Sequence, residues 1–214
     1  ENIIHISGGD NNVLLIVGDS KDASVGIAYS LGSANGRGVA ASTSADRLGR
    51  TYYAAPVEIL DDAAFATGTV SSTGKYLEKV KTTGISDKGG FAVDENTGYL
   101  YGWGPNGWNG CIGLEKQSDD YTYAAKVLSG EYSTISGEAY MTNVHQVIGG
   151  NGYGACVTED HYMLYWGVHT PDLKSGGVVP NSTWANKTGF NGTVIDPGPV
   201  FANYCKGEKY VRST

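Results

Sequence analysis

The sequence predicts an all-β protein made of repeated antiparallel β units, propeller-blade-like or another β-rich body, with a loop-rich C-terminal segment. Glycine supplies 32 of the 214 residues, about twice the usual share. Together with abundant Ser, Thr, Asn and Tyr, it favours short strands joined by tight turns. The runs of Ala, Leu, Glu and Lys that long helices need are scarce. Apolar residues make up 40% of the chain, enough for a core between such strands.

A short motif occurs twice with the same spacing. Residues 100–104 read Leu-Tyr-Gly-Trp-Gly, and residues 164–167 read Leu-Tyr-Trp-Gly. Each copy closes a strand-like run that begins at a glycine, Gly90 in the first copy and Gly154 in the second. The interval between these glycines (154 − 90) is nearly the same as that between the closing glycines (167 − 104). Such a repeat predicts a chain built from similar structural units.

A third and more divergent copy lies nearer the N-terminus. Residues 9–16 match the first half of the unit and residues 28–32 match the second. Leu31 stands where the later copy has Trp103. Residues 94–98, short polar residues followed by Gly, predict a hairpin turn. Residues 159–162 hold the same place in the next copy without the Gly, so a less tight turn is expected there.

The copies suggest how the chain is divided. They start near Ile3, Val80 and Val144. We therefore expect one β-rich domain over residues 1–169. The segment 170–214 is rich in Pro, Gly, Asn and Thr and is expected to form a loop-rich cap or an extended segment. The expected repeats span about 3–79, 80–143 and 144–169.

The unit from residue 90 to residue 114 resembles the regulator-of-chromosome-condensation repeat. The resemblance covers residues 80–170 well and residues 3–60 loosely. It implies four-stranded blades of a β-propeller, a ring that normally closes with about six or seven blades, so three copies are too few to close one. The family's best-known activity, nucleotide exchange on a small GTPase, is not expected, because its acidic interaction surface cannot be mapped onto this chain. The matching positions are Trp103, Gly104, Asn106 and Gly113.

The charge pattern limits the partners that the chain can have. The net charge is −7, and no cluster of Lys and Arg exceeds two or three residues. Nucleic acid is not expected as a partner, because phosphate contacts need a basic face. Membrane insertion is not expected either, because no apolar stretch approaches the roughly 20 residues of a membrane span.

Aromatic residues are the candidates for a binding surface. The chain has 15 Tyr and 4 Trp but only 4 Phe, and Tyr and Trp combine apolar area with a polar tip. For Trp103 and Trp166, packing in the core of their units is the favoured interpretation. The residues proposed for ligand binding are Trp103, Asn106, Trp108, Tyr121 and Tyr123.

No sequence pattern predicts a metal site, a cofactor or a catalytic residue. A glycosidase-like pair of carboxylates stays open, because spatial separation cannot be read from sequence. Two arrangements also stay open for the cysteines Cys111, Cys156 and Cys205: small buried residues, or a disulfide from Cys205 to one of the others. Glycosylation sequons occur at Asn181, Asn186 and Asn191.

These features together favour a non-enzymatic binding module that is extracellular or on a cell or virion surface. It would recognise a glycan or protein receptor, as an adhesin or tail-fibre tip does, and would form a homo-oligomer. A self-assembling subunit of an extracellular filament, pilus or coat is the alternative. A polysaccharide hydrolase is a second alternative.

Overall fold

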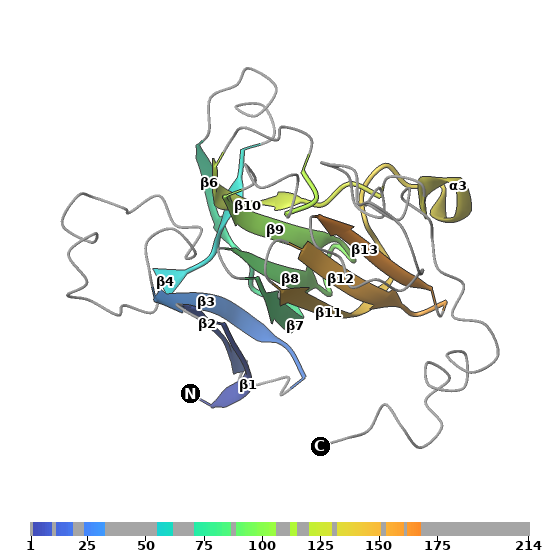
Figure 1. The fold of residues 1–214 in the computed structure, drawn as a ribbon. Coiled ribbons are helices and arrows are strands. Elements are labelled where there is room, and N and C mark those ends of the chain that lie inside the picture. Colours follow the sequence, from blue (N-terminus) through green and yellow to red (C-terminus); the bar gives the residue numbers. More distant parts are fainter. Residues whose placement is uncertain are drawn as a thin grey trace.

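The computed structural model describes residues 2–9, 12–18, 24–32, 55–61, 71–86, 89–105, 112–114, 120–129, 132–150, 153–160 and 162–167. Within these residues the structure is almost entirely β-sheet, and α3 (Ser133–Ser136) is the one helix. The strands pair with their neighbours almost everywhere in antiparallel fashion (Figure 1). The predicted fold class, all-β with repeated antiparallel units, is confirmed.

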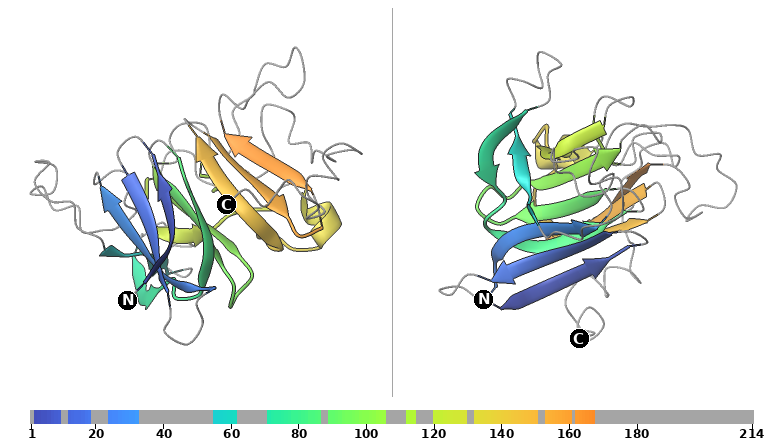
Figure 2. Two further views of the ribbon diagram at one scale, coloured as in Figure 1. Left: turned by 90° about the horizontal axis from the view of Figure 1, so that it is seen from below. Right: turned by 90° about the vertical axis from the view of Figure 1, so that its left-hand side faces the viewer.

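The strands form three antiparallel units, which we call blades. Blade 1 is β1-β2-β3-β4, blade 2 is β7-β8-β9-β10, and blade 3 is β11-β12-β13. Blades 1 and 2 are linked by a single bridge from Gly26 to Val80, and blade 3 is a separate sheet. Figure 2 shows the blades side by side in blue, green and orange. A short antiparallel pair, β5 and β6, joins β10 through a parallel pairing of β5.

The thirteen strands have definite bounds among the described residues. They are β1 Ile3–Gly8, β2 Asn12–Gly18, β3 Gly26–Gly32, β4 Ala55–Pro56, β5 Glu58–Leu60, β6 Ser72–Tyr76, β7 Val80–Ile85, β8 Gly90–Asp94, β9 Leu100–Pro105, β10 Asp120–Lys126, β11 Val144–Gly150, β12 Tyr153–Thr158 and β13 Met163–Gly167.

The three blades share one backbone irregularity. In each, the register between the first two strands shifts by a β-bulge, at Ile4, Lys81 and His145. A bulge re-aims the side chain that it carries. Beside each bulge, one backbone N–H closes the hairpin onto a carbonyl the same number of positions earlier (18 − 2, 95 − 79, 159 − 143). These bonds are Gly18 to Asn2 at 2.8 Å, Glu95 to Lys79 at 2.7 Å and Glu159 to Asn143 at 2.8 Å.

The two connections between blades are also built alike. In each connection, one residue lies three positions before the first strand of the next blade. Its backbone hydrogen-bonds to the third strand of the preceding blade and to the residue that follows the fourth strand of that blade. Before β7 this residue is Leu77, and before β11 it is Met141. Before β7, the backbone N–H groups of Ala28, Val57 and Leu77 donate to the carbonyls of Leu77, Ala28 and Val57 in that order, each at 3.0 Å. Before β11, those of Leu100, Val127 and Met141 donate to the carbonyls of Met141, Leu100 and Val127 at 2.9, 2.9 and 2.7 Å.

Each blade packs face to face on the next. We call the face toward the following blade the forward face and the opposite one the rear face; neighbouring residues of a strand alternate between them. Two buried apolar clusters fill the two interfaces between blades. The first joins Leu14, Ile16 and Ala28 of blade 1 to Ala92, Tyr101 and Trp103 of blade 2. The second joins Phe91, Val93 and Leu100 of blade 2 to Cys156, Leu164 and Trp166 of blade 3.

A cross-strand pair of Gly and Trp explains the repeated motif. Gly90 of β8 pairs with Trp103 of β9, and Gly154 of β12 pairs with Trp166 of β13. A Cβ on either glycine would lie 2.5 Å from the six-membered ring of the paired Trp. The glycine is therefore needed because the indole ring lies over it on the rear face. In blade 1 the same place is taken by a pair of medium-sized residues, Val13 and Leu31.

The first strands of successive blades also approach closely. The Ser7 hydroxyl of β1 donates to the Thr83 carbonyl of β7 at 3.0 Å and lies 2.8 Å from the Thr83 hydroxyl. At the next interface Gly84 lies against β11, where a Cβ would come 2.8 Å from the backbone of Val147 and Ile148. Position 7 and its equivalent, position 84, therefore both pack against the following blade.

The first strands begin at Ile3, Val80 and Val144. The proposed division into one domain of three repeats stays a prediction. The segment 170–214 lies outside the described residues. So do Cys111, Cys205 and the three sequon residues Asn181, Asn186 and Asn191.

Replacing Gly154 by alanine tests the packing of the Trp ring. The added methyl would lie 2.5 Å from Trp166 and 2.8 Å from Phe91, so we expect a loss of about 1–3 kcal/mol in the free energy of unfolding. Urea unfolding measures it. Gly8→Ala is the matched control, because a Cβ there has nothing within 4 Å; equal stability of the two variants would contradict this account.

Candidate functional site

The bulges place the side chains of Ile4, Lys81 and His145 at one edge of the molecule, beside the turns between the second and third strands of each blade. We call this edge the turn rim; its described members are Lys81, Glu95, His145, Glu159 and Asp160. The bulged residue and the turn residue that it faces are separated by the same interval in both later blades (95 − 81 and 159 − 145). In blade 1 the same two places hold the uncharged residues Ile4 and Gly18, where a Cβ on Gly18 would lie 2.8 Å from the Ile4 side chain.

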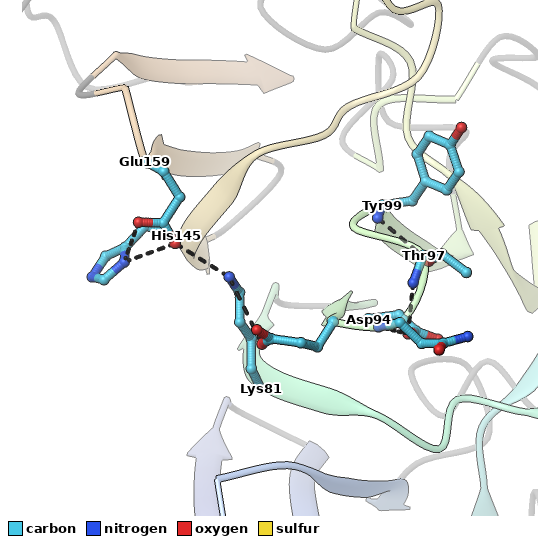
Figure 3. A network of polar contacts seen from close by, with 8 residues as sticks. Lys81, Asp94, Thr97, Tyr99, His145 and Glu159 are labelled. Carbon is cyan, nitrogen blue, oxygen red and sulfur yellow. Dashed lines mark hydrogen bonds and ion pairs between the residues drawn. The ribbon is translucent and has the colours of Figure 1, made fainter.

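Lys81 links two blades through charge. Its Nζ lies 3.2 Å from Glu159 Oε1 of blade 3 and 4.0 Å from Glu95 Oε2 of its own blade. His145 Nδ1 lies 3.2 Å from Glu159 Oε2, and Figure 3 shows Glu159 between His145 and Lys81. The Glu and His side chains are about half exposed. Exposed pairs of this kind contribute only about 0–1 kcal/mol to stability, so their common placement is not explained by folding alone.

The carboxyl of Glu159 stays charged to a lower pH than an ordinary glutamate does. Burial alone would raise its pKa, but the hydrogen bonds from Lys81 and His145 outweigh that effect, and the pKa is lowered from 4.5. A carboxylate with a lowered pKa is a poor general acid or base at neutral pH. The group is suited to binding a cation or a basic side chain.

The turns that carry these carboxylates are held rigidly. In blade 2 the Asp94 carboxylate accepts from the backbone N–H of Asn96 at 2.8 Å and of Thr97 at 3.3 Å. Gly98 follows with φ of 70°, which confirms the Gly-dependent hairpin predicted at residues 94–98. Glu95, between these fixed points, therefore has little backbone freedom.

The equivalent turn of blade 3 is held by a second network. The Tyr132 hydroxyl donates to Asp160 at 2.9 Å from Oδ1 and 3.0 Å from Oδ2, and Asn143 Nδ2 donates to Oδ1 at 3.0 Å. Burial, together with the hydrogen bond and charge of Asp160, raises the pKa of Tyr132 to about 12, against opposing hydrogen bonds from Asn143 and Thr158. Tyr132 therefore keeps its proton and acts as a fixed donor.

Two of the predicted ligand-binding aromatics, Trp103 and Tyr121, are buried in different apolar clusters. Trp103 is 0% exposed and Tyr121 is 1% exposed. Trp103 lies in the cluster between blades 1 and 2, and Tyr121 lies in the cluster between blades 2 and 3. The favoured interpretation of Trp103 and Trp166 as packing residues agrees with their full burial.

The remaining candidate residues divide into two groups. Tyr123 is partly buried against the second cluster, and burial, followed by the charge of Glu58, raises its pKa. Asn106 and Trp108 lie outside the described residues, so ligand binding there stays a prediction. The sequence reasoning missed the turn rim, although the repeated spacing of a basic residue and a glutamate could have indicated it.

No other chemistry is assembled in the described part of the chain. It contains no group of three or more His, Cys, Asp or Glu residues that could hold a metal ion. Cys156 is a free, buried thiol, and burial, followed by the charge of Asp160, raises its pKa. Among these residues no helix has the length and apolar character to cross a membrane.

Comparisons with known proteins identify the fold. No protein-family model matches, and no curated protein matches. Among solved structures the chain is similar to yeast RCC1 (Prp20) bound to Kap60, at 16% identity and a TM-score of 0.51 over 84% of this chain and 34% of that one. It is similar to human WBSCR16 at 17% identity and a TM-score of 0.51, over 91% and 38%. A second Prp20p structure, from Saccharomyces cerevisiae, matches at 16% identity and 0.51, over 86% and 37%.

The RCC1-like blade fold is thus shown, and the chain spans about a third of the length of these proteins. The prediction of a binding module on a cell or virion surface is wrong, and so is the extracellular location. The similar structures are RCC1-like proteins, and Prp20p is described with binding to Gsp1p and histones, which are proteins of the cell interior. The two alternative predictions, a subunit of an extracellular filament, pilus or coat and a polysaccharide hydrolase, are wrong as well. The non-enzymatic prediction agrees with these comparisons.

Replacing Lys81 by methionine tests the link between blades. At pH 7 we expect the free energy of unfolding to fall by about 0.5 kcal/mol, because the pairs are partly exposed. Since the pKa of Glu159 is lowered on folding, this stabilisation is present above pH 4.5 and is lost as the pH falls through the lowered pKa. Urea unfolding at several pH values measures the effect.

The control for this experiment is Lys75→Met, at an exposed lysine of β6. We expect Lys75→Met to follow the wild type at every pH. A stability difference between Lys81→Met and the wild type that stays the same from pH 7 down to strongly acidic pH would contradict the account.

Proposed function

We propose that this chain is a non-catalytic protein-binding module that presents its turn rim to a basic surface of a partner protein. The observation that carries the proposal is the repetition of an exposed glutamate, Glu95 and Glu159, at the same place on two adjacent blades. Each is held beside a bulged cationic or ionisable residue and on a fixed turn. Repeated side chains on rigid elements are suited to recognising a surface.

The charge of the chain supports a basic partner. The net charge is −7, and complementary charge speeds association and selects partners more than it adds affinity. The similar structures support a protein as the partner class, because Prp20 was described bound to Kap60 and Prp20p with binding to Gsp1p and histones. Those partners are the partners of Prp20, and for this chain they suggest a histone as a probe of binding.

Binding of a core histone dimer, followed by calorimetry at near-physiological salt, tests the proposal. We expect the wild type to bind and the double variant Glu95→Gln/Glu159→Gln to bind roughly tenfold more weakly, because each lost charge contact is worth about 0.5–1 kcal/mol. We also expect the wild-type affinity to fall as salt is raised.

The matched control is Glu58→Gln, on β5 and away from the turn rim. It removes one negative charge, as each substitution of the double variant does, and should leave the affinity unchanged. The proposal is overturned if the wild type does not bind the histone dimer, or if Glu58→Gln weakens binding as much as the double variant does.

A further inference from the structure

Three equivalent positions differ sharply in exposure. Val80 and Val144, which begin the first strands of blades 2 and 3, are 0% and 1% exposed, whereas Ile3 of blade 1 is 60% exposed. Val80 is covered by the forward face of blade 1, and Val144 by that of blade 2. The described residues provide no such cover for Ile3.

The same contrast occurs three residues further along. Thr83 and Val147 are 4% and 1% exposed, whereas Ile6 is 65% exposed. The contrast extends across the rear face of the sheet. In blade 2 the rear-face residues Ala92, Tyr101 and Trp103 are buried, whereas their blade 1 equivalents are only half-buried. These equivalents are Leu15, Tyr29 and Leu31.

The rear face of blade 1 is continuous and apolar. Its cross-strand pairs are Val13 with Leu31, Leu15 with Tyr29 and Val17 with Ile27, and Ile6 extends it across β1 beside Leu15. No charged side chain interrupts these pairs. An apolar sheet face of this kind marks a docking surface, and within this chain the equivalent face is covered twice by another blade.

The opposite end of the array is open in a complementary way. Ile148 of β11 is 51% exposed, whereas the equivalent Gly84 is buried against the following blade. Val157 is half-buried, whereas its equivalents Val93 and Ile16 are 1% and 0% exposed. The forward face of blade 3 therefore presents apolar residues where the forward faces of blades 1 and 2 are covered by a following blade.

We propose that a second copy of this chain covers the open face, with the forward face of blade 3 of one copy packed on the rear face of blade 1 of the other. Two copies joined this way twice bring together six of the blades described here, which lies within the roughly four to eight of closed propellers, whereas three copies would bring together nine. The contact is head-to-tail, so two different surfaces meet, and two copies joined at both ends form a closed ring. This inference concerns the blade faces and does not depend on the turn rim.

The solution mass tests the inference first. One chain has a mass of 22.5 kDa, so the proposed pair has twice that mass. We expect light scattering on a size-exclusion column to give the mass of two chains for the wild type over a wide concentration range. The mass of a single chain throughout, or that of a trimer or polymer, overturns the proposal.

Single substitutions then locate the interface. Ile6→Asp changes the rear face, Ile148→Asp changes the forward face, and both residues are more than half exposed, so each variant should fold. We expect each variant alone to shift to the mass of one chain, with circular dichroism like that of the wild type. Tyr76→Ser, at an exposed residue of β6 outside both faces, is the control and should stay dimeric. A variant at either face that stays dimeric overturns the proposal.

Mixing the two variants tests the head-to-tail geometry. In the mixture, the unchanged rear face of the Ile148→Asp chain can meet the unchanged forward face of the Ile6→Asp chain. One intact interface then exists, which neither variant has alone. We expect a species with the mass of two chains in the mixture; its absence would show that the faces do not meet each other and would overturn the proposal.

Discussion

A blade of this protein has two apolar faces, and neither can remain in water at little cost. This constraint determines the rest of the structure, because a sheet of three or four short strands is stable only when its faces are covered. Blade 2 is the one unit of the described chain with both faces covered, by Leu14 and Ile16 on its rear side and by Val147 and Trp166 on its forward side. The bulges, the closing backbone bonds and the Gly–Trp pairs keep these faces in register.

Much of this architecture could be predicted from sequence. The Leu-Tyr-(Gly)-Trp-Gly motif indicated repeated β units because its spacing is tied to the glycine that makes room for the indole ring, Gly90 or Gly154. The divergent first unit keeps the same order of strands and turns although its residues differ. Val13 and Leu31 fill the place of Gly and Trp there, so the pattern is preserved in volume rather than in residue type.

The candidate site could not be predicted in the same way. Trp103 and Tyr121 lie on consecutive strands but on opposite faces of blade 2. The face that each side chain takes depends on the register between β9 and β10, and this register cannot be read from the sequence. The turn rim depends on bulges at Lys81 and His145, which composition does not show, and its one sequence signal is the repeated spacing of a basic residue and a glutamate. The surface location was inferred from abundant Gly, Tyr, Asn, Ser and Thr, which report short strands and turns rather than a cellular compartment.

The central claim is that neighbouring blades stabilise each other by face-to-face packing, and a double-mutant cycle on one inter-blade contact tests it most directly. Phe91 and Trp166 meet edge to face with ring centroids 5.4 Å apart. Phe91→Leu and Trp166→Leu install the residues that blade 1 carries at these places, Leu14 and Leu31. Unfolding free energies of the wild type, both single variants and the double variant should give a coupling energy of about 0.5–1.5 kcal/mol. A coupling energy indistinguishable from zero would contradict the account.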